Sequence, residues 1–521
     1  MSHFSDNDEN DCCNHPKERR RSFLDLGGAN SLNKFASSYT RAQSYLGLSL
    51  VETSVVQGTE DDLSPCTSLD DVVTESAIDD SPRGNERALD QINAFSFERN
   101  EESSLLSRRT SKADSERLIT GDSTAPQTIF NCINTLMGIG MLSLPFGFRL
   151  SGWVLGTLML LFSSIVTNIS AKMLGKILRK YPHLMSYGDI AHLYGGRGIN
   201  IVVTLVFSFD LLGAMISLII LFSDSFHILF PSLQRVLLKG IIVAVLFVLS
   251  FLPLSILSLC SLLGIICTSL LIVVIIICGL LTSTSPGSLV TPAVTNLWPS
   301  EYKYLFLSLG LFMAPWGGHP VFPELYRDMR HRSKFSKCCN IAFGITFNLD
   351  YLIAAIGFLM FGINCQDSLT KNLMTNKNYP DWVRPLICLF MGLLPVSKLP
   401  LITRPIITVY ESFFKLNQTN YAVIKNGIRQ EVYGIKRVLS RVVFCVLLLL
   451  VSLIFNSFGK VISFLGSAIC FTICMTLPLI FYLKFYDDEI TVMERLLIKF
   501  GILIGVVFSL IGTYGSIVID I

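Results

Sequence analysis

The chain has 521 residues, of which 51% are hydrophobic and only 16% are charged. A soluble chain would carry about 25% charged residues, so the composition excludes an ordinary soluble protein. The mean hydropathy of +0.54 agrees with this, and a net charge of +3 with short, scattered basic clusters gives no surface for nucleic acid. The charge is unevenly spread, because the first 120 residues are polar and apolar blocks begin after Pro126.

Residues 1–120 lack the apolar content that would offset the entropy of ordering, so we expect a disordered cytosolic tail. The chain start has no apolar core typical of a signal peptide. Two tail segments resemble acidic dileucine sorting signals that would bind a sorting adaptor. They run from Glu101 to Leu106 and from Asp114 to Ile119. An ordinary polar tail is the alternative interpretation.

Residues 121–521 are expected to form one transmembrane domain. A membrane-spanning helix needs about 20 mostly apolar residues. The sequence then predicts about eleven such helices in a lipid bilayer, over residues 126–148, 152–176, 199–222, 237–254, 257–281, 303–323, 338–361, 383–409, 438–458, 460–483 and 495–519.

The Lys and Arg residues of the connecting loops predict the orientation, because cytosolic loops carry the excess of positive charge. With the N-terminal tail in the cytosol, the cytosolic loops hold 19 Lys and Arg residues and the opposite loops hold 8. The N-terminus is therefore expected in the cytosol. Eleven spans then place the C-terminus on the lumenal side.

The first predicted span is poorly suited to a continuous helix. Gly138, Gly140 and Pro145 fall within eight residues of one another. In lipid, such a break is tolerated only where the freed backbone groups are buried in protein or line a cavity. Asn131 and Asn134 lie just before the break on one helix face, where they would hydrogen-bond a substrate or brace the unwound segment.

The sixth predicted span has the same character. Pro315, Gly317, Gly318 and Pro320 fall within six residues near its middle. Many transporters contain two inverted five-helix repeats whose interrupted helices occupy corresponding positions. Spans one and six are five apart and meet that expectation. The alternative is that these Gly and Pro residues only allow close helix packing.

Two broken helices predict a class of ligand. A break exposes helix N–H groups, which suit a carboxylate, and helix carbonyls, which suit an ammonium. A zwitterionic α-amino acid carries both groups. The breaks therefore indicate the ligand class without identifying the ligand.

Ionisable residues at bilayer depth are costly and are candidates for function. Asp210 lies in the third predicted span, Asp350 in the seventh, Lys398 in the eighth, and His319 in the second break. A buried structural ion pair is an equal alternative for Asp210 and Lys398, and Lys398 is also a candidate fixed cation in place of bound Na⁺. His319 titrates nearest neutral pH, so it is a proton-coupling candidate or a satisfied interface histidine.

Several motifs together resemble the amino acid/auxin permease family. The stretch PQTIFNCINTLMGIGMLSLP at residues 126–145 and WGGHPVFPELYRDMR at residues 316–330 are the longest. Shorter matches occur at residues 186–189, 209–213, 357–362 and 464–474. Within the family, the chain is most similar to fungal vacuolar neutral amino acid/proton antiporters.

This resemblance implies an all-α bundle of eleven helices with LeuT-like 5+5 inverted repeats, in the vacuolar or lysosomal membrane. It implies proton-coupled antiport of neutral amino acids into the lumen. The implied substrate-binding residues are Asn131, Asn134, Gly138, Ile139, Gly140, Met141, Trp316, Gly317, Gly318 and His319. Pro315 and Pro320 depart from the family pattern, which leaves the substrate range open.

Two other functions are weighed against a carrier. An amino acid sensor would bind its ligand at the same site and signal through the N-terminal tail. An enzyme is not expected, because the sequence shows no Ser/His/Asp set, metal cluster or phosphate-binding loop. No cofactor and no metal site are predicted, and Asp210, His319, Asp350 and Lys398 are the candidates for moving a proton.

Overall fold

The structure is a computed structural model. It describes residue 38 and residues 121–251, 254–413, 422–425, 428–431 and 435–519. The two dileucine-like segments of the tail lie outside these residues.

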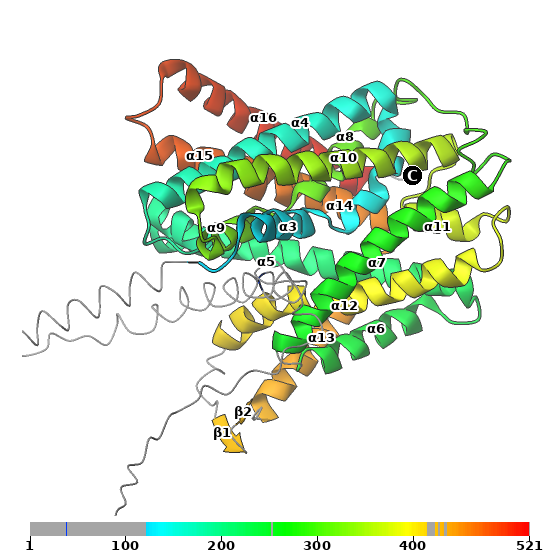
Figure 1. The fold of residues 1–521 in the computed structure, drawn as a ribbon, viewed down its shortest axis with the longest axis horizontal. Helices are drawn as coiled ribbons and strands as arrows, with labels where there is room; N and C mark the ends of the chain where they lie inside the picture. The colour runs from blue at the N-terminus through cyan, green and yellow to red at the C-terminus, as the bar shows by residue number, and fades with distance from the viewer. Residues whose placement is uncertain are drawn as a thin grey trace, which may run out of the picture.

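The described residues form a bundle in which α4, α5 and α10 run along the long axis and α7 crosses them obliquely (Figure 1). The first half contains α3 (Ala125–Leu136), η4 (Ile139–Ser143), α4 (Leu144–Lys180), α5 (Tyr187–Leu229), α6 (Arg235–Leu249) and α7 (Leu254–Leu281). The second half begins with a series of short helices, which are α8 (Tyr304–Met313), η5 (Ala314–Trp316), η6 (His319–Val321), α9 (Phe322–Asp328) and η7 (Arg332–Lys334).

The chain continues through α10 (Phe335–Phe361), η8 (Gly362–Asn364), α11 (Leu369–Thr375) and α12 (Val383–Phe413). An antiparallel hairpin follows, made of β1 (Ala422–Lys425) and β2 (Ile428–Glu431). The last helices are α13 (Ile435–Ile454), α14 (Phe458–Phe464), η10 (Leu465–Thr476), α15 (Leu477–Phe485) and α16 (Val492–Val518).

Nine helical segments of the described residues are long and apolar enough to cross a membrane. The first two predicted spans differ from this count, because the part of the first span after the break is joined to the second span in one continuous segment, Ile139–Lys180, and α3 alone has only 12 residues. The joined segment bends at Gly152, whose φ of 72° favours glycine and whose Cβ would lie 2.6 Å from the Leu297 carbonyl oxygen. The fourth predicted span corresponds to α6, which has only 15 residues. The all-helical membrane class is confirmed, and the count of eleven stays a prediction.

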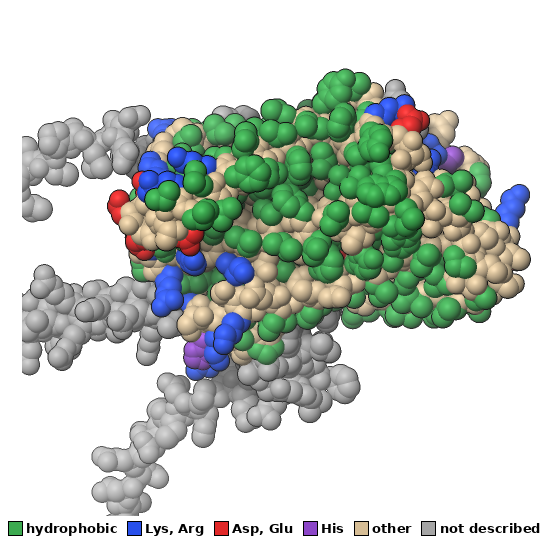
Figure 2. Space-filling model, turned by 90° about the horizontal axis from the view of Figure 1, so that it is seen from above, with side chains coloured by type: hydrophobic (Ala, Val, Ile, Leu, Met, Phe, Trp, Pro, Cys, Tyr) green, Lys and Arg blue, Asp and Glu red, His purple; other side chains and the backbone are tan. Residues whose placement is uncertain are grey.

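The two ends of the bundle differ in what they carry. We call the end at which α3 begins the tail side, and the end at which α4 bends at Gly152 the far side. The residues at the start of α3 and the C-terminus lie toward opposite ends (Figure 1). Figure 2 shows hydrophobic side chains across the middle of one face, with charged side chains at the ends. Exposed Leu447, Leu503 and Leu510 are typical of a surface that meets lipid.

The start of α3 is tied to the end of α9 on the tail side. The Ser123 amide donates to the Asp328 carbonyl over 2.8 Å, and the Arg330 amide donates to the Ser123 carbonyl over 2.9 Å. Ser123 Oγ also donates to the Asp328 carboxylate. Thr124 and Gln127 form a capping box that starts α3. The tail-side halves of both broken spans are therefore joined at their bases.

Candidate functional site

The first break separates α3 from η4 and α4. Helix α3 ends at Leu136, and Gly138 adopts an extended conformation before the 3₁₀ turns of η4 begin. Met137 directly follows the last residue of α3. Its carbonyl oxygen accepts a hydrogen bond from Lys398 Nζ over 2.8 Å. A cation suits this position, because the C-terminal end of a helix carries partial negative charge. The predicted break is thus present and is capped by a side chain from α12.

The second break separates α8 from α9. After Met313 the chain forms the short turn η5, passes through Gly317 and Gly318, and forms the second turn η6. The Gly318 amide donates to the Trp316 carbonyl over 2.8 Å, and the Val321 amide donates to the Gly318 carbonyl over 3.0 Å. The four Gly and Pro residues predicted to interrupt this span therefore do so.

The two breaks lie against each other. A Cβ at Gly140 would come within 3.2 Å of the Pro315 nitrogen, which is backbone and has little freedom to move. A Cβ at Gly317 would come within 2.9 Å of Cys470 Sγ on η10. Glycine at these two positions allows η4, the second break and η10 to converge.

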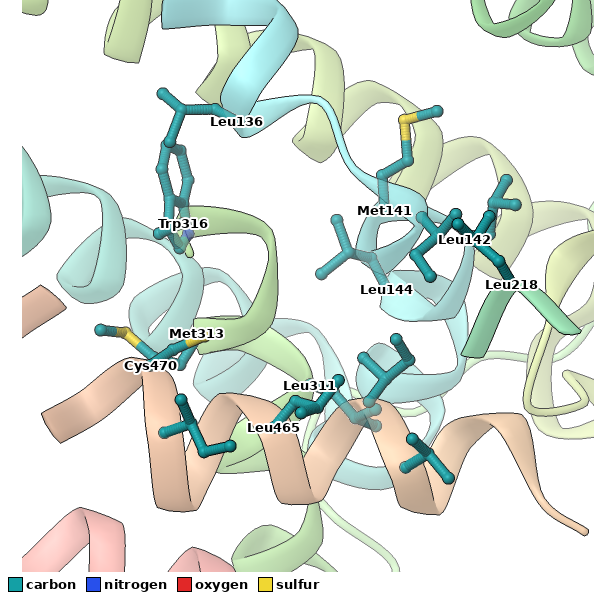
Figure 3. Close-up of a cluster of buried hydrophobic side chains, with 14 of the residues drawn as sticks. Leu136, Met141, Leu142, Leu144, Leu218, Leu311, Met313, Trp316, Leu465 and Cys470 are labelled. Carbon is teal, nitrogen blue, oxygen red and sulfur yellow. The ribbon is translucent and has the colours of Figure 1, made fainter. Parts of the chain in front are cut away.

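A cavity of about 190 Å³ lies at this convergence. Its volume is that of roughly six water molecules, and it is smaller than the roughly 300–1,000 Å³ of sites for drug-sized ligands. Figure 3 shows its surroundings, with Leu136 and Trp316 opposite Met141 and Leu142, and with Leu465 and Cys470 on the helix below. The lining residues are Asn134, Thr135, Leu136, Gly138, Ile139, Gly140, Asp210, Leu211, Ala214, Leu218, Ala314, Pro315, Gly317, Val321, Lys398, Leu401, Ile402, Ile462, Leu465 and Cys470.

One acidic and one basic side chain face this cavity. Asp210 comes from the middle of α5 and Lys398 from the middle of α12, and both are partly buried. No ion pair joins these two described residues, and Lys398 Nζ donates instead to the Met137 carbonyl. The structural ion pair weighed as an alternative is therefore not formed in this conformation.

The structure divides the residues predicted to bind substrate into two groups. Asn134, Gly138, Ile139, Gly140 and Gly317 line the cavity. The others are Asn131, Met141, Trp316, Gly318 and His319, and the structure places these outside its lining. Trp316 is fully buried and stacks on Phe343 of α10, with ring centroids 5.6 Å apart. It supports the second break from behind.

Asn131 meets a residue of the N-terminal tail. Its Nδ2 donates to Ser38 Oγ over 2.8 Å, and Asn131 is almost fully buried. Ser38 is also buried, and it contacts Ser123 and the Asp328 carboxylate at the joined bases of α3 and α9. Asn131 therefore contacts a tail residue at the joined bases of α3 and α9, and its role in binding substrate or bracing the unwound segment stays a prediction.

His319 is also engaged away from the cavity. The side chain is 0% exposed, and Nε2 lies 2.8 Å from Ser170 Oγ and 3.1 Å from the Thr167 carbonyl oxygen. Both partners belong to α4. Nδ1 is buried with no hydrogen-bond partner. The histidine thus holds η6 against α4.

Asp350 is as deeply buried as His319, and it is the one of the four ionisable candidates whose polar side-chain atoms are all buried without a hydrogen-bond partner among the described residues. It is 0% exposed, and neither carboxyl oxygen has a hydrogen-bond partner. It lies on α10, outside the cavity lining.

Part of the cavity wall was not anticipated from the sequence. Leu465 and Cys470 come from η10, a twelve-residue stretch with π-helical hydrogen bonding. Long π-helices are rare, and shorter π-bulges often occur at functional sites. In the sequence, this stretch stands out only as a motif shared with the family. Its composition does not distinguish a π-helix from an α-helix.

Two interrupted membrane helices that converge on a small cavity define a membrane transport protein of the broken-helix class. Spans one and six of the sequence supply the two interruptions. A family model described as "Transmembrane amino acid transporter protein" matches residues 121–518. The chain therefore belongs to this family, is an amino acid transporter by family membership, and is not an enzyme.

Plant transporters are among its relatives. Amino acid transporter AVT1B of Arabidopsis thaliana is 28% identical over 412 residues, which cover 77% of this chain and 72% of the relative. AVT1H of the same plant is 28% identical and covers 75% of this chain and 88% of its own length. AVT1C is 25% identical and covers 94% of this chain and 84% of its own length.

Solved transporter structures are similar at low identity. MhsT in complex with L-phenylalanine has a TM-score of 0.41 at 13% identity, covering 75% of this chain and 98% of its own. MHP1, a nucleobase-cation-symport-1 family transporter, has a TM-score of 0.45 at 12% identity, covering 75% of this chain and 90% of its own.

Proposed function

We propose that this protein is a proton-coupled antiporter that moves neutral amino acids from the cytosol into an acidic vacuolar or lysosome-like lumen. The observation that carries the proposal is the cavity between the two breaks, which presents one carboxylate and one ammonium that are not paired with each other. Family membership supplies amino acids as the substrate class.

The charged ends of an amino acid match the polar parts of this cavity. Asp210 offers a carboxylate to the substrate ammonium, beside the carbonyl end of α3. Lys398 donates one of its three N–H groups to the Met137 carbonyl, and the other two can donate to the substrate carboxylate. The start of η4 adds N–H groups that lack helix partners. Hydrogen bonds to charged groups contribute about 1.5–3 kcal/mol each, so these contacts favour a zwitterion.

The rest of the cavity favours an uncharged substrate side chain. Most of the lining is apolar, including Leu211, Leu218, Leu401, Ile402 and Leu465. A charged side chain placed against this wall would lose its hydration without gaining a partner, which is costly. Neutral amino acids are therefore the preferred substrates.

The direction of transport follows from sidedness and from the compartment. The excess of Lys and Arg in the loops of the tail side supports a cytosolic N-terminus. The resemblance to fungal vacuolar antiporters supports an acidic lumen on the far side. Each pH unit across the membrane supplies about 1.4 kcal/mol to a 1:1 exchange, or roughly tenfold accumulation.

The test uses the full-length protein in vesicles acidified inside. Labelled glutamine, leucine, isoleucine or tyrosine should enter the vesicles, and a protonophore should abolish the uptake. Uptake that survives the protonophore would exclude proton coupling. Uptake of lysine or glutamate at rates equal to leucine would contradict the preference for neutral side chains.

The second candidate function is an amino acid sensor, and the contact between Ser38 and Asn131 favours it. This contact joins the tail to the first broken helix, so a change at the break would reach the tail. Deletion of residues 1–120 separates the two functions. A carrier keeps transport in vesicles after the deletion, whereas a sensor loses recruitment of its partners.

A further inference from the structure

Asp350 is a buried acid that the proposed substrate cavity does not use. The other ionisable candidates are engaged, since Lys398 is bonded to the Met137 carbonyl, His319 to α4, and Asp210 faces the cavity. Both oxygens of Asp350 are fully buried without a hydrogen-bond partner. A carboxyl group kept in this setting needs a reason, because burial of an unpartnered polar group is costly.

Asp350 lies on α10 between the contacts that this helix makes with the two broken spans. Two turns earlier on α10, Phe343 stacks on Trp316 of the second break. Two turns later, Gly357 packs against Pro145, just after the first break, where a Cβ would lie 2.4 Å from Pro145 Cγ. Helix α10 also contacts α3 and η4 directly. A rearrangement of the first broken helix therefore changes the surroundings of Asp350.

No counter-charge reaches Asp350 from the described elements packed on α10. Helices α3, η4, η8 and α7 contain no Asp, Glu, Lys, Arg or His. On α4, Arg149 donates to the Cys365 carbonyl on the far side, and Lys172 donates to Asn340 toward the tail side. Helix α9 also packs on α10, through Phe322 against Phe343, and it carries Glu324, Arg327 and Asp328. The remaining ionisable groups on the packed elements and on α10 are Cys132, Lys176, Arg179, Lys180, Cys267, Cys278, Arg332, Lys334, Lys337, Cys338, Cys339 and Tyr351.

The lack of a nearby counter-charge among the described residues favours the neutral form of Asp350 in the conformation shown. An ionised carboxylate in this position would be an uncompensated buried charge, which costs several kcal/mol. Thr346, one turn earlier on the same helix face, is also fully buried, and its hydroxyl lacks a partner. The acid and the hydroxyl form a small polar spot behind the first break.

We propose that Asp350 carries the coupled proton. The carboxylate takes up a proton from water when the rearranged first broken helix opens it to the acidic side. The neutral acid crosses with the substrate-free carrier and returns the proton to water when it is opened to the neutral side. The deprotonated carrier then takes the amino acid in the opposite direction. This inference rests on the proposed proton antiport and names the residue that performs it.

The experiment compares two transport modes in proteoliposomes that contain the full-length protein. The first is exchange of labelled leucine for internal leucine at equal pH on both sides. The second is net accumulation driven by a pH gradient. The variants are Asp350→Asn, which mimics the neutral acid, and Asp350→Glu, which keeps a titratable group. The matched control is Asp381→Asn, since Asp381 is exposed on the far side.

Asp350→Asn is fixed in the neutral form that crosses without substrate, so it should lose exchange of leucine at equal pH. Its pH-driven accumulation should fall from about tenfold per pH unit to none. Asp350→Glu should retain accumulation with a shifted pH profile, and Asp381→Asn should behave as the wild type. Because Asn is neutral and of the same size, the variant should remain monodisperse in detergent.

Three outcomes would overturn the inference. Accumulation by Asp350→Asn equal to that of the wild type would show that another group carries the proton. Loss of both transport modes in a monodisperse Asp350→Glu protein would assign Asp350 a structural role. Accumulation driven by a sodium gradient and lost in the variant would replace the proton by Na⁺. A wild-type protein that exchanges leucine but never accumulates it would instead refute the antiport itself.

Discussion

Lys398 Nζ donates to the carbonyl oxygen of Met137 over 2.8 Å and places a fixed positive charge at the C-terminal end of α3. The two residues are 261 positions apart and belong to α12 and to the first break. This contact does for the broken helix what a bound cation would do. It also places the ammonium at the edge of the cavity, where a substrate carboxylate would bind.

Replacement of Lys398 by Met should weaken substrate binding. The variant keeps much of the side-chain length but leaves the Met137 carbonyl unpaired and removes the cation. Loss of one charged hydrogen bond costs about 1.5–3 kcal/mol, so the apparent KM should rise at least roughly tenfold. Uptake of labelled leucine at several concentrations measures it. Lys377→Met, at an exposed position, is the control, and an unchanged KM in Lys398→Met would contradict the assignment.

The glycines of the two breaks give a second prediction that separates side-chain from backbone clashes. A Cβ at Gly317 would lie 2.9 Å from Cys470 Sγ, whereas a Cβ at Gly140 would meet the backbone at Pro315. Gly317→Ala should therefore lower the rate of uptake, and Cys470→Ala in the same chain should restore it. Gly140→Leu should abolish uptake, by about tenfold or more, and Cys470→Ala should not rescue it.

Gly344→Leu is the control for this series, because a Cβ at Gly344 meets nothing within 4 Å. It should transport within about twofold of the wild type at equal protein amounts. Near-normal uptake by a correctly localised Gly140→Leu protein would count heavily against the cavity described above.

The breaks were predictable because their cause is local. Gly138, Gly140, Gly317 and Pro315 disfavour a continuous helix wherever they occur, so composition alone located both interruptions. The wall of the cavity was less predictable, because it depends on which faces of distant helices meet. Leu465 and Cys470 enter it from a π-helical stretch that has no distinct sequence signal.

The asparagines show the limit of helix-face arguments. Asn131 and Asn134 are three residues apart and were expected to share one role. Asn134 lines the cavity, whereas Asn131 meets Ser38, a partner 93 positions earlier in the chain. A spacing of three places two side chains on one face, but only the packed structure shows what lies opposite each of them.

His319 gives a third prediction, which concerns position rather than proton transfer. Its Nε2 meets Ser170 Oγ and the Thr167 carbonyl, so it fixes η6 against α4. His319→Ala and Ser170→Ala should each slow transport, and the double variant should be little worse than either alone, because both remove one contact. The pH profile of transport should keep its midpoint in all three proteins. A shift of that midpoint in His319→Ala but not in Ser170→Ala would restore His319 as the proton carrier.

The last prediction concerns a charged cluster on the far side. Lys371 Nζ lies 3.3 Å from the Asp224 carboxylate of α5 and 3.2 Å from that of Asp367, and Arg235 lies 3.4 Å from Asp224. Burial alone would lower the pKa of Lys371, but the carboxylates of Asp367 and Asp224 outweigh burial and raise it. The cluster thus connects α5, α11 and the segment before α11 through a charged lysine.

Lys371→Gln should lower the free energy of unfolding by about 1–2 kcal/mol, between the values for exposed and buried pairs. Because the folded-state pKa is raised, the stabilisation is fully present below the unfolded-state value of about 10.4 and is lost as the pH rises through the folded-state pKa. The difference in unfolding temperature between wild type and variant should therefore be constant from roughly pH 6 to 9. It should shrink above roughly pH 10.5, because Lys371 loses its proton there.

Thermal unfolding of the purified proteins in detergent measures this difference. Lys303→Gln is the matched control, because Lys303 pairs with Glu301 on the same side of the bundle but both side chains are more than half exposed. It should leave the unfolding temperature unchanged, since exposed pairs are screened by solvent. If Lys371→Gln and Lys303→Gln unfold at the same temperature at pH 7, the far-side cluster does not hold α5 and α11 together.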